Sequence, residues 1–511
     1  KTSKNRFAVE VPEATDQLTV SYSVYCHEFS VRTSDLTDRH AFLTGAELFL
    51  WPVGMGNAPV EVRVRVPDSW DLQTSLPTER CGAGEYSLKA EGLDDLIDSP
   101  ILAGQLDSVQ FSALARPHSF VLDGLDGIPV PDCMVADTVS IIEHAAQIFG
   151  GSLPYQEYKF LCMFTDSGRG GLEHLSSSAL LAPRTTFRPR KHYQEFMGLV
   201  AHEFFHVWNV KRMRPAELWK FDYEHENYTS LLWVAEGFTA YYDDHLCRRA
   251  GILTSKDYLA IVAKGITDLR RSPGRMHQSL SEASYDAWIR LYRPEEHTRN
   301  STLSYYGNGA LVAMCLDLRI RAETKGEKSL DDAMRHLYEH TFENGQGYSE
   351  ESVCQSLSHA AGCDLAEMLA CLVHQPLDPD FAGMFTAFGL ELDESSSDAP
   401  YLGVHFKAGT TTIGSVIEDS PADCGHLLPG DEILAVAGLR VTARLWSDVF
   451  DHVASCGEQV EFLLSRRGSI VQQALTPAPQ PHGKCHLVPA KDATAQQLEL
   501  RRGWLFETAD E

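Results

Sequence analysis

Two histidines spaced four residues apart are the strongest chemical signal in the sequence. They lie in the run His202-Glu203-Phe204-Phe205-His206. On a helix, residues i and i+4 share one face, so the two imidazoles can hold one Zn²⁺. Glu203 is turned off that face, so its carboxylate can reach a water molecule on the metal instead of the metal itself. The spacing therefore indicates metal-assisted hydrolysis.

A zinc ion in a catalytic site needs a third protein ligand and an open position. Glu236 is the best candidate, because it is a lone acid in the apolar stretch 233–238, where a carboxylate is expensive to bury unless it is paired or binds a metal. Asp243 follows two helical turns later and could accept a hydrogen bond from a ligand histidine, which would fix the tautomer of that ring. The alternative is that both histidines are ordinary core or surface groups and Glu236 is solvated.

The elements that must position these residues are predicted to be helices. The segment around the two histidines has an apolar side for burial, and residues 193 to about 374 are mostly helical in pattern. Upstream, residues 138–149 predict a helix that Gly150-Gly151 ends, and residues 158–164 predict a strand. Several cysteines in these apolar stretches, Cys162, Cys247 and Cys315, are expected to be small core residues.

Alternating apolar and polar residues predict β structure over residues 18–122. Leu18, Val20, Tyr22 and Val24 alternate in this way, and so do the valines from position 60 to position 66. Such alternation is typical of antiparallel sheets with one buried face. We expect an N-terminal β-sandwich domain over residues 1–125.

The C-terminal third has a different organisation. The polar, breaker-rich segment 393–400 predicts a linker between a mainly helical domain at 126–392 and a β-rich domain at 399–480. Residues 476–481 are Pro-rich, and we expect the charged residues 481–511 to form a C-terminal tail. The predicted fold class is therefore multidomain α+β.

The composition excludes several functions. The chain has 511 residues, 43% of them hydrophobic, which is enough for a sizeable core. Its formal charge of −27 makes nucleic acid and anionic membranes poor general partners. No apolar run is long enough to be a transmembrane segment, and the 12 scattered cysteines favour reduced thiols and a cytoplasmic location, with a removed leader left open.

The run from His202 to Pro215, HEFFHVWNVKRMRP, resembles the signature of the glycyl aminopeptidase family of gluzincin zinc metallopeptidases, which are relatives of aminopeptidase N. The run EGFTAYY from Glu236 to Tyr242 is similar to the family's third-ligand helix. The resemblance implies an N-terminal β domain, a thermolysin-like catalytic domain and a C-terminal PDZ domain. It also implies one Zn²⁺ per chain and peptide substrates with a free N-terminus, with small N-terminal residues such as Gly or Ala preferred.

Two further motifs are similar to those of aminopeptidase N relatives. Gly170-Gly171-Leu172-Glu173-His174 resembles Gly-x-Met-Glu-Asn, where a backbone edge aligns the substrate as an added strand and the Glu binds its α-amine. This resemblance implies substrate binding by Gly170, Gly171 and Glu173, with His174 in place of Asn. Alternatively, the motif is only a glycine-rich loop.

The second motif resembles Tyr-x-x-Gly and consists of Tyr306-Gly307-Asn308-Gly309. It implies that Tyr306 donates its O–H to the oxyanion of the tetrahedral intermediate. Asn308 stands where relatives have Lys. Tyr305 is expected only to pack before the helix. The alternative is that Tyr306 has the same packing role.

The C-terminal β-rich domain resembles a PDZ domain. Its carboxylate-binding loop would be formed by Leu402, Gly403 and Val404, and the run Pro429-Gly430-Asp431-Glu432-Ile433-Leu434 is a specific PDZ feature. A groove helix is expected at 445–455. Such a groove takes a peptide C-terminus or strand; the alternative is a domain that only packs against the catalytic unit.

The predicted function is zinc-dependent aminopeptidase activity. Other readings are an endopeptidase, an epoxide hydrolase or a catalytically inactive PDZ-bearing scaffold. The amine anchor Glu173 favours an exopeptidase. Basic residues near the zinc motif, Arg212 and Arg214, either grip a peptide or form structural pairs with acids at 222, 224 or 226.

Overall fold

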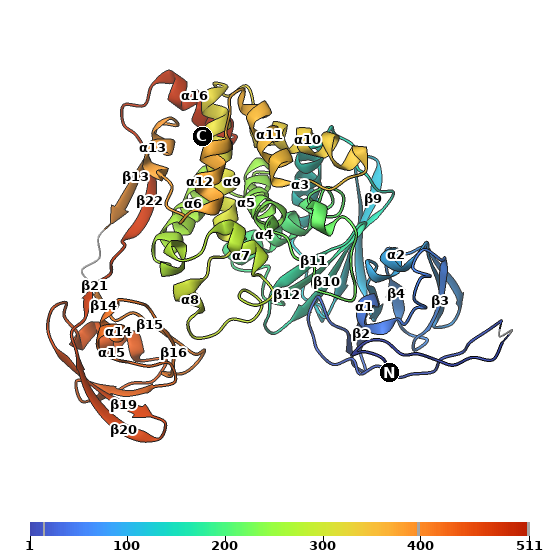
Figure 1. Ribbon diagram of the computed structural model, residues 1–511, viewed down its shortest axis with the longest axis horizontal. Coiled ribbons are helices and arrows are strands. Elements are labelled where there is room, and N and C mark those ends of the chain that lie inside the picture. The colour runs from blue at the N-terminus through green and yellow to red at the C-terminus, as the bar shows by residue number, and fades with distance from the viewer. Residues whose placement is uncertain (14–15, 396–398, 508–511) are drawn as a thin grey trace. The chain divides into compact units, whose positions relative to one another are not determined.

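A computed structural model describes residues 1–13, 16–395 and 399–507, and the chain is a multidomain α+β protein (Figure 1). It divides into two compact units, Lys1–Asn227 and Tyr228–Glu511, which we describe separately. Within the described residues, no helix is both long and apolar enough to cross a membrane.

The first unit begins with two β-sheets that share one hydrophobic core. The core includes Trp70, Leu72 and Tyr86. One sheet has the order β1-β2-β7-β4 and the other β3-β6-β5. The elements are β1 (Asp35–Leu36), β2 (His40–Leu43), α1 (Gly45–Leu48), β3 (Val60–Arg65), β4 (Asp71–Gln73), β5 (Thr78–Gly82), β6 (Glu85–Ala90), α2 (Leu93–Ile97) and β7 (Ile101–Gly104).

The alternation of valines in β3 predicted its geometry correctly, since the valines are more buried than Glu61, Arg63 and Arg65. The same pattern at residues 18–24 was misleading. No strand forms there in the described part of the first unit, and Leu18 and Val20 are exposed. Alternation forms a strand only where another strand is available to pair with it, and the first pairing starts at β1.

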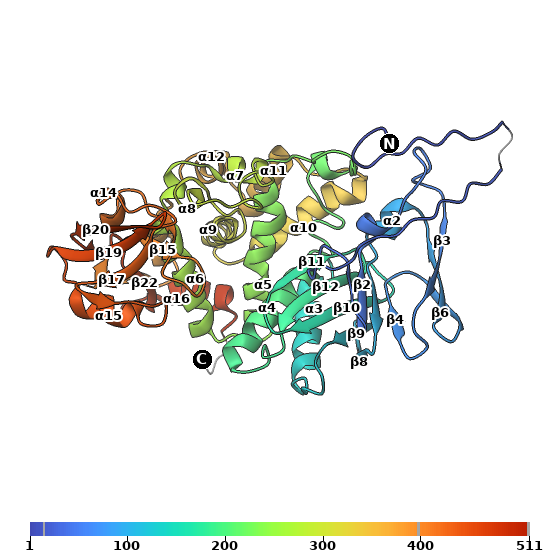
Figure 2. The ribbon, with the colours of Figure 1, turned by 90° about the horizontal axis from the view of Figure 1, so that it is seen from below.

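A mixed five-stranded sheet follows, in the order β11-β12-β10-β9-β8. Its strands are β8 (Asp107–Ala113), β9 (Arg116–Asp123), β10 (Tyr158–Thr165), β11 (Gly170–Glu173) and β12 (Ser177–Pro183). The predicted helix and strand near 138–164 are confirmed as α3 (Met134–Ile148) and β10. α3 and α4 (Arg190–Phe205) pack together against this sheet (Figure 2), and the short helix η1 (Ala216–Leu218) lies after α4.

β8 and β9 were expected in the N-terminal domain, but β8 pairs with β9, and β9 pairs in turn with β10. The pairing is parallel between β9 and β10, so the sheet continues directly into the segment that carries the predicted site. β11 lies at the edge of this sheet and is bonded to β12 alone among the described strands.

The second unit begins with helices arranged around α9 (Gly307–Glu323), which is buried on nearly every side. The predicted helical character of this region is confirmed. The surrounding elements are the π-helix η2 (Trp233–Gly237), α5 (Phe238–Arg249), α6 (Ser255–Arg270), η3 (Pro273–Met276), α7 (Leu280–Tyr285), α8 (Thr298–Ser301), α10 (Leu330–His340), η4 (Phe342–Asn344), α11 (Glu350–Ala361), α12 (Ala366–His374) and α13 (Phe381–Thr386).

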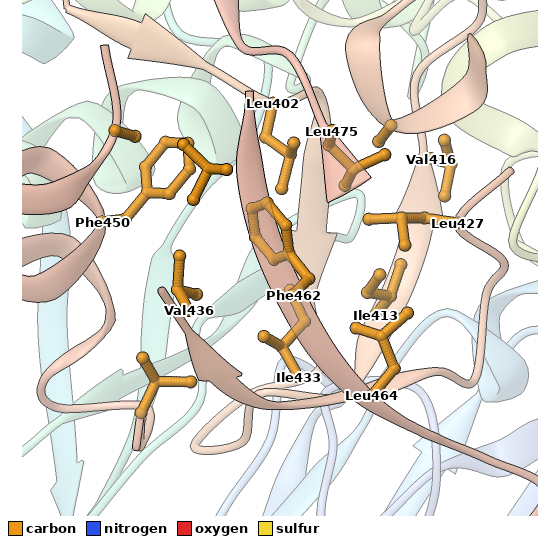
Figure 3. Packing of buried hydrophobic residues seen from close by; sticks show 14 residues of the cluster. Leu402, Ile413, Val416, Leu427, Ile433, Val436, Phe450, Phe462, Leu464 and Leu475 are labelled. Atoms are coloured by element: carbon orange, nitrogen blue, oxygen red, sulfur yellow. The ribbon is translucent and has the colours of Figure 1, made fainter. Parts of the chain in front are cut away.

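Small β-sheets with a core of their own follow (Figure 3). We call residues 399–479 the C-terminal β segment. Its elements are β14 (Pro400–Tyr401), β15 (Val404–Phe406), β16 (Ile413–Val416), α14 (Pro421–Cys424), β17 (Glu432–Val436), β18 (Leu439–Arg440), α15 (Trp446–Val453), β19 (Val460–Arg466), β20 (Ser469–Leu475) and β21 (Ala478–Pro479). The helix expected at 445–455 is confirmed as α15.

The segments on either side of the C-terminal β segment pair with each other. β13 (Leu390–Ser395) and β22 (Lys484–Pro489) run antiparallel along their whole length, as Figure 1 shows. Part of the expected linker is therefore strand, and residues 396–398 lie outside the described residues. The expected tail forms β22 and α16 (Ala495–Leu505), and α16 returns to α9 with Trp504 fully buried.

Candidate active site

The carboxyl end of α4 carries the two histidines. His202 and Glu203 lie in its last turn, and His206 is the residue that caps it. The two rings stand nearly perpendicular, with centroids 4.9 Å apart. Their helical spacing therefore places both imidazoles at one point, as the sequence predicts.

The orientation of the His206 ring is fixed by the turn that follows the helix. Nδ1 of His206 lies 2.7 Å from the main-chain carbonyl of Asn209, which can only accept, so Nδ1 carries the proton and donates it. This leaves the lone pair on Nε2 for a metal. The turn itself is held by the amide of Lys211, which donates to the carbonyl of His206 at 3.0 Å. Sequence reasoning missed Asn209, because a main-chain contact leaves no signature in residue type.

The three predicted ligands belong together. Ligand atoms of His202, His206 and Glu236 all lie within 4.8 Å of one another. Two imidazole nitrogens and one carboxylate oxygen are a donor set that Zn²⁺ takes in catalytic sites. The orientation of His206 fits this use, and the residues present suit one Zn²⁺.

The local structure around Glu236 explains why a glycine follows it. Glu236 lies in the π-helix η2, a form that often occurs at functional sites. A Cβ on Gly237 would lie 2.5 Å from the Cα of Gly309, and a Cβ on Gly309 would lie 2.7 Å from the Cα of Gly237. The backbones of η2 and α9 therefore touch, which brings Glu236 close to the start of α9.

Tyr306 is the residue that caps the start of α9. Burial raises the pKa of its phenol far above the ordinary value, and the Glu236 carboxylate raises it further. The phenol therefore keeps its proton and can donate it in a hydrogen bond. Its oxygen lies 3.3 Å from the hydroxyl of Tyr292, which the sequence did not mark, while Tyr305 is buried and stacks on Tyr306 at 4.8 Å.

Gly171 on β11 lies directly against Glu203. A Cβ at position 171 would come within 2.0 Å of Oε1 of Glu203, so only glycine leaves room for this carboxylate. Glu203 is 4% exposed. Gly170 has more space, because the nearest atom to its Cβ position is 3.9 Å away on Val31.

Glu173 lies at the end of β11 and joins the same cluster. Ligand atoms of Glu173, Glu203 and His206 also lie within 4.8 Å of one another. The fully buried Tyr158 is close enough to sense both carboxylates, since burial first, and then Glu203 and Glu173, raise the pKa of its phenol. The motif at 170–174 and the histidine motif therefore meet, although the sequence separates them.

The two basic residues after the helix have structural contacts. The guanidinium of Arg212 donates to the carbonyls of Val207 at 2.7 Å and Pro154 at 2.8 Å. Arg214 donates to the carbonyl of Lys211 at 2.6 Å and lies over an aromatic ring at 4.7 Å, that of Phe221. These contacts favour the structural interpretation of both arginines.

Asp243 lies on α5, where its carboxylate accepts a hydrogen bond from the amide of Asp244 at 2.5 Å. Its hydrogen bond to a ligand histidine stays a prediction. In the C-terminal β segment, Gly403 has a positive φ of 86°, and its carbonyl accepts from the amide of Ile417 at 2.8 Å. Leu402 and Val404 flank it, with Val404 starting β15.

Comparisons with known proteins agree with this geometry. Residues 195–312 match the M61 glycyl aminopeptidase family, and residues 1–105 match the N-terminal domain of peptidase family M61. A search of curated proteins found no match.

Among solved structures, the chain is similar to an aminopeptidase N family protein from Idiomarina loihiensis, with 28% identity and a TM-score of 0.87 over 94% of this chain and 85% of that one. An M1 zinc metallopeptidase from Deinococcus radiodurans shows a weaker likeness, with 17% identity and a TM-score of 0.49 over 70% of this chain and 74% of that one. The match at 195–312 contains all three metal ligands, and this similarity to M61 glycyl aminopeptidases, together with the ligand geometry, indicates that the chain is a zinc metallopeptidase.

Proposed function

We propose that this aminopeptidase removes small N-terminal residues, Gly or Ala, from peptides, with Glu203 as general base and Glu173 as the anchor for the substrate's amine. One observation carries the proposal. The carboxylates of Glu173 and Glu203 lie within 4.8 Å of each other and of His206, so an N-terminus held by the first presents its peptide bond to the second. The preference for Gly or Ala comes from the family and not from a pocket in this structure.

Bound Zn²⁺ would act as a Lewis acid that makes a water molecule nucleophilic near neutral pH. His202, His206 and Glu236 would hold the ion. Glu203 takes a proton from the attacking water and delivers it to the leaving amine. The Glu203 carboxylate is buried, and the absence of a side chain at Gly171 leaves the room that it occupies.

Tyr306 would donate its O–H to the developing oxyanion. Its raised pKa supports this role, because a phenol that stays protonated at neutral pH can donate a hydrogen bond. The contact with Tyr292 supplies a second hydroxyl that can accept or release that hydrogen bond as the substrate enters.

β11 would align the substrate through Gly170 and Gly171, because an edge strand offers unpaired N–H and C=O groups to an added strand. Glu173 ends the same strand and would pair with the α-ammonium group. Asp243 would orient His202, because Nδ1 of His206 already donates to Asn209.

We further infer that a thermolysin-like peptidase domain occupies the region from about residue 126 to 392, and that residues 399–480 form a PDZ domain. A contact between β15 and α15 supports this, since a PDZ groove lies between such a strand and helix. Leu402, Gly403 and Val404 would form the carboxylate loop for a peptide C-terminus. The ring centroids of Phe406 on β15 and Trp446 on α15 lie 4.8 Å apart.

The deciding experiment uses Gly- and Ala-anilides, their N-acetylated forms and the zinc-loaded protein. Glu203→Gln should lower turnover by at least about 10²-fold and keep its zinc. Glu195→Gln is the matched control, since this exposed carboxylate lies on the same helix and pairs with Lys191. Near wild-type turnover in Glu203→Gln would refute its role as base.

The same assay separates the alternatives. Release only from the free-amine substrates supports an aminopeptidase, and equal release from the acetylated forms indicates an endopeptidase. Zinc binding without any release favours a scaffold or an enzyme with a narrow substrate.

A further inference from the structure

Glu173, the proposed amine anchor, lies at an edge of the sheet, where a strand has a hydrogen-bonded neighbour on one side only. Glu173 is the last residue of β11, and β11 is bonded to β12 alone among the described strands. The turn that joins them begins at His174, whose amide donates to the carbonyl of Ser177 at 2.9 Å. An edge hairpin of this kind needs an outside contact to hold its end in one place.

Asp98, which follows α2, supplies that contact. It caps the carboxyl end of α2, and its Oδ2 accepts a hydrogen bond from the amide of Leu175 at 2.7 Å. Its Oδ1 lies 3.3 Å from Nδ1 of His174. One carboxylate therefore holds both the backbone and a side chain of the β11–β12 turn.

The same carboxylate also binds the segment that follows the metal helix. Nζ of Lys211 donates to Oδ1 of Asp98 at 2.6 Å, and the Lys211 side chain is 11% exposed. The Lys211 amide donates to the carbonyl of His206. Asp98 thus connects the turn beside Glu173 with the turn that orients His206.

Electrostatics make this connection rigid. Burial raises the pKa of Asp98, but the Lys211 ammonium and His174 lower it more, to well below its ordinary value. The carboxylate is therefore charged. A largely buried ammonium and carboxylate must stay together, because separating them leaves an uncompensated charge. The imidazole of His174, which stands where relatives have Asn, reaches this carboxylate.

We infer that Asp98 is a positioning residue for substrate binding, which fixes Glu173 relative to Glu203 and His206 and so sets how strongly the enzyme discriminates in favour of a free amine. This inference rests on the proposed role of Glu173. It gives the N-terminal sheets a part in substrate recognition, since α2 belongs to that region.

The test compares two hydroxamates that both ligate zinc, glycine hydroxamate with an amine and acetohydroxamate without one. Calorimetric dissociation constants for the zinc-loaded protein give a ratio that measures the anchor directly. Glu173→Ala should bring this ratio close to one. Asp98→Asn should reduce the ratio at least about fivefold, with zinc content unchanged. Asp95→Asn is the matched control on α2, where Asp95 accepts a hydrogen bond from the amide of Glu91.

Two results distinguish the positioning role of Asp98 from the proposed amine-binding role of Glu173. A wild-type ratio in Asp98→Asn, with the ratio lost in Glu173→Ala, would overturn the role of Asp98 and leave the anchor standing. An unchanged ratio in Glu173→Ala would overturn the anchor itself and the inference with it.

If Asp98→Asn does not fold, the double variant Asp98→Asn/Lys211→Met removes the uncompensated ammonium. It should fold and show the same reduced ratio. A wild-type ratio in the double variant would equally overturn the role of Asp98.

Discussion

Replacing Gly171 by alanine should inactivate the enzyme without removing its zinc. The added Cβ would lie 2.0 Å from Oε1, 2.3 Å from Cδ and 2.5 Å from Cγ of Glu203. Cβ atoms do not approach other heavy atoms closer than 3.0 Å, so the carboxylate or β11 must shift by about 1 Å. Neither histidine lies among the atoms nearest to this Cβ position, so the metal ligands are not the groups displaced.

The size of the effect follows from this displacement. Moving a reacting group by about 1 Å can cost about 10²-fold in rate, which corresponds to about 2.7 kcal/mol of activation free energy. We therefore expect kcat for Gly-anilide to fall about 10²-fold in Gly171→Ala. Metal analysis should still find one zinc per chain, because His202, His206 and Glu236 are unchanged.

The neighbouring glycine provides the comparison. A Cβ at position 170 has its nearest neighbour at 3.9 Å, an ordinary contact, so Gly170→Ala should lose less than about threefold. Both variants change the same strand by one methyl group and differ only in what that group meets. Activity of Gly171→Ala within threefold of wild type would refute the steric reasoning, and loss of zinc would show that the displacement is not confined to Glu203.

Three further predictions concern stability. A chelator should lower Tm and added zinc should restore it, because an ion bound only by the folded chain stabilises that state; a Tm independent of zinc would contradict the ligand set. Burial lowers the pKa of His40, but hydrogen bonds to Asp123 and Asp35 raise it above the ordinary value. The protonated ring therefore stabilises the folded state fully below about pH 6.5, and this stabilisation is lost as the pH rises through the pKa of His40 in the folded protein. The difference in unfolding free energy between wild type and His40→Gln should therefore shrink with rising pH, and a constant difference from pH 5 to 9 would contradict this. Trp504→Ala should cost about 3–5 kcal/mol, measured by denaturant unfolding beside the exposed control Arg502→Ala, since Trp504 is fully buried; equal stability of the two variants would contradict that cost.

Much of the candidate site could be predicted because its signals are local. The spacing of His202 and His206 requires only that the segment be helical. Glu236 is conspicuous as a lone acid in an apolar run, and Tyr306 precedes an evidently apolar helix. In each case, neighbouring residues in the sequence carry the information.

The residues that could not be predicted act over long sequence separations or through the main chain. Asp98 lies 76 positions before its partner His174, and nothing in the sequence of α2 marks the residue that caps its carboxyl end. Asn209 contributes a carbonyl, which every residue has. The false strand at 18–24 has the opposite cause, since a correct local pattern there lacks a partner.

The pairing of β13 with β22 has a consequence for how this protein is put together. Ser395 and Lys484 face each other across the two strands, so the C-terminal β segment leaves and re-enters the helical unit at neighbouring points. The C-terminal β segment is thus an insertion between the two strands of this hairpin. α16, which follows β22, belongs to the helical unit. Cutting the chain before the C-terminal β segment would also discard Trp504 and the helix that covers α9.

If the C-terminal β segment were deleted and β13 joined to β22 by a two-residue turn, every helix and strand of the helical unit would remain. The same hairpin could accept a different module in its place. The C-terminal β segment and the helical unit are thus joined at a single junction, where one could be exchanged without interrupting the other.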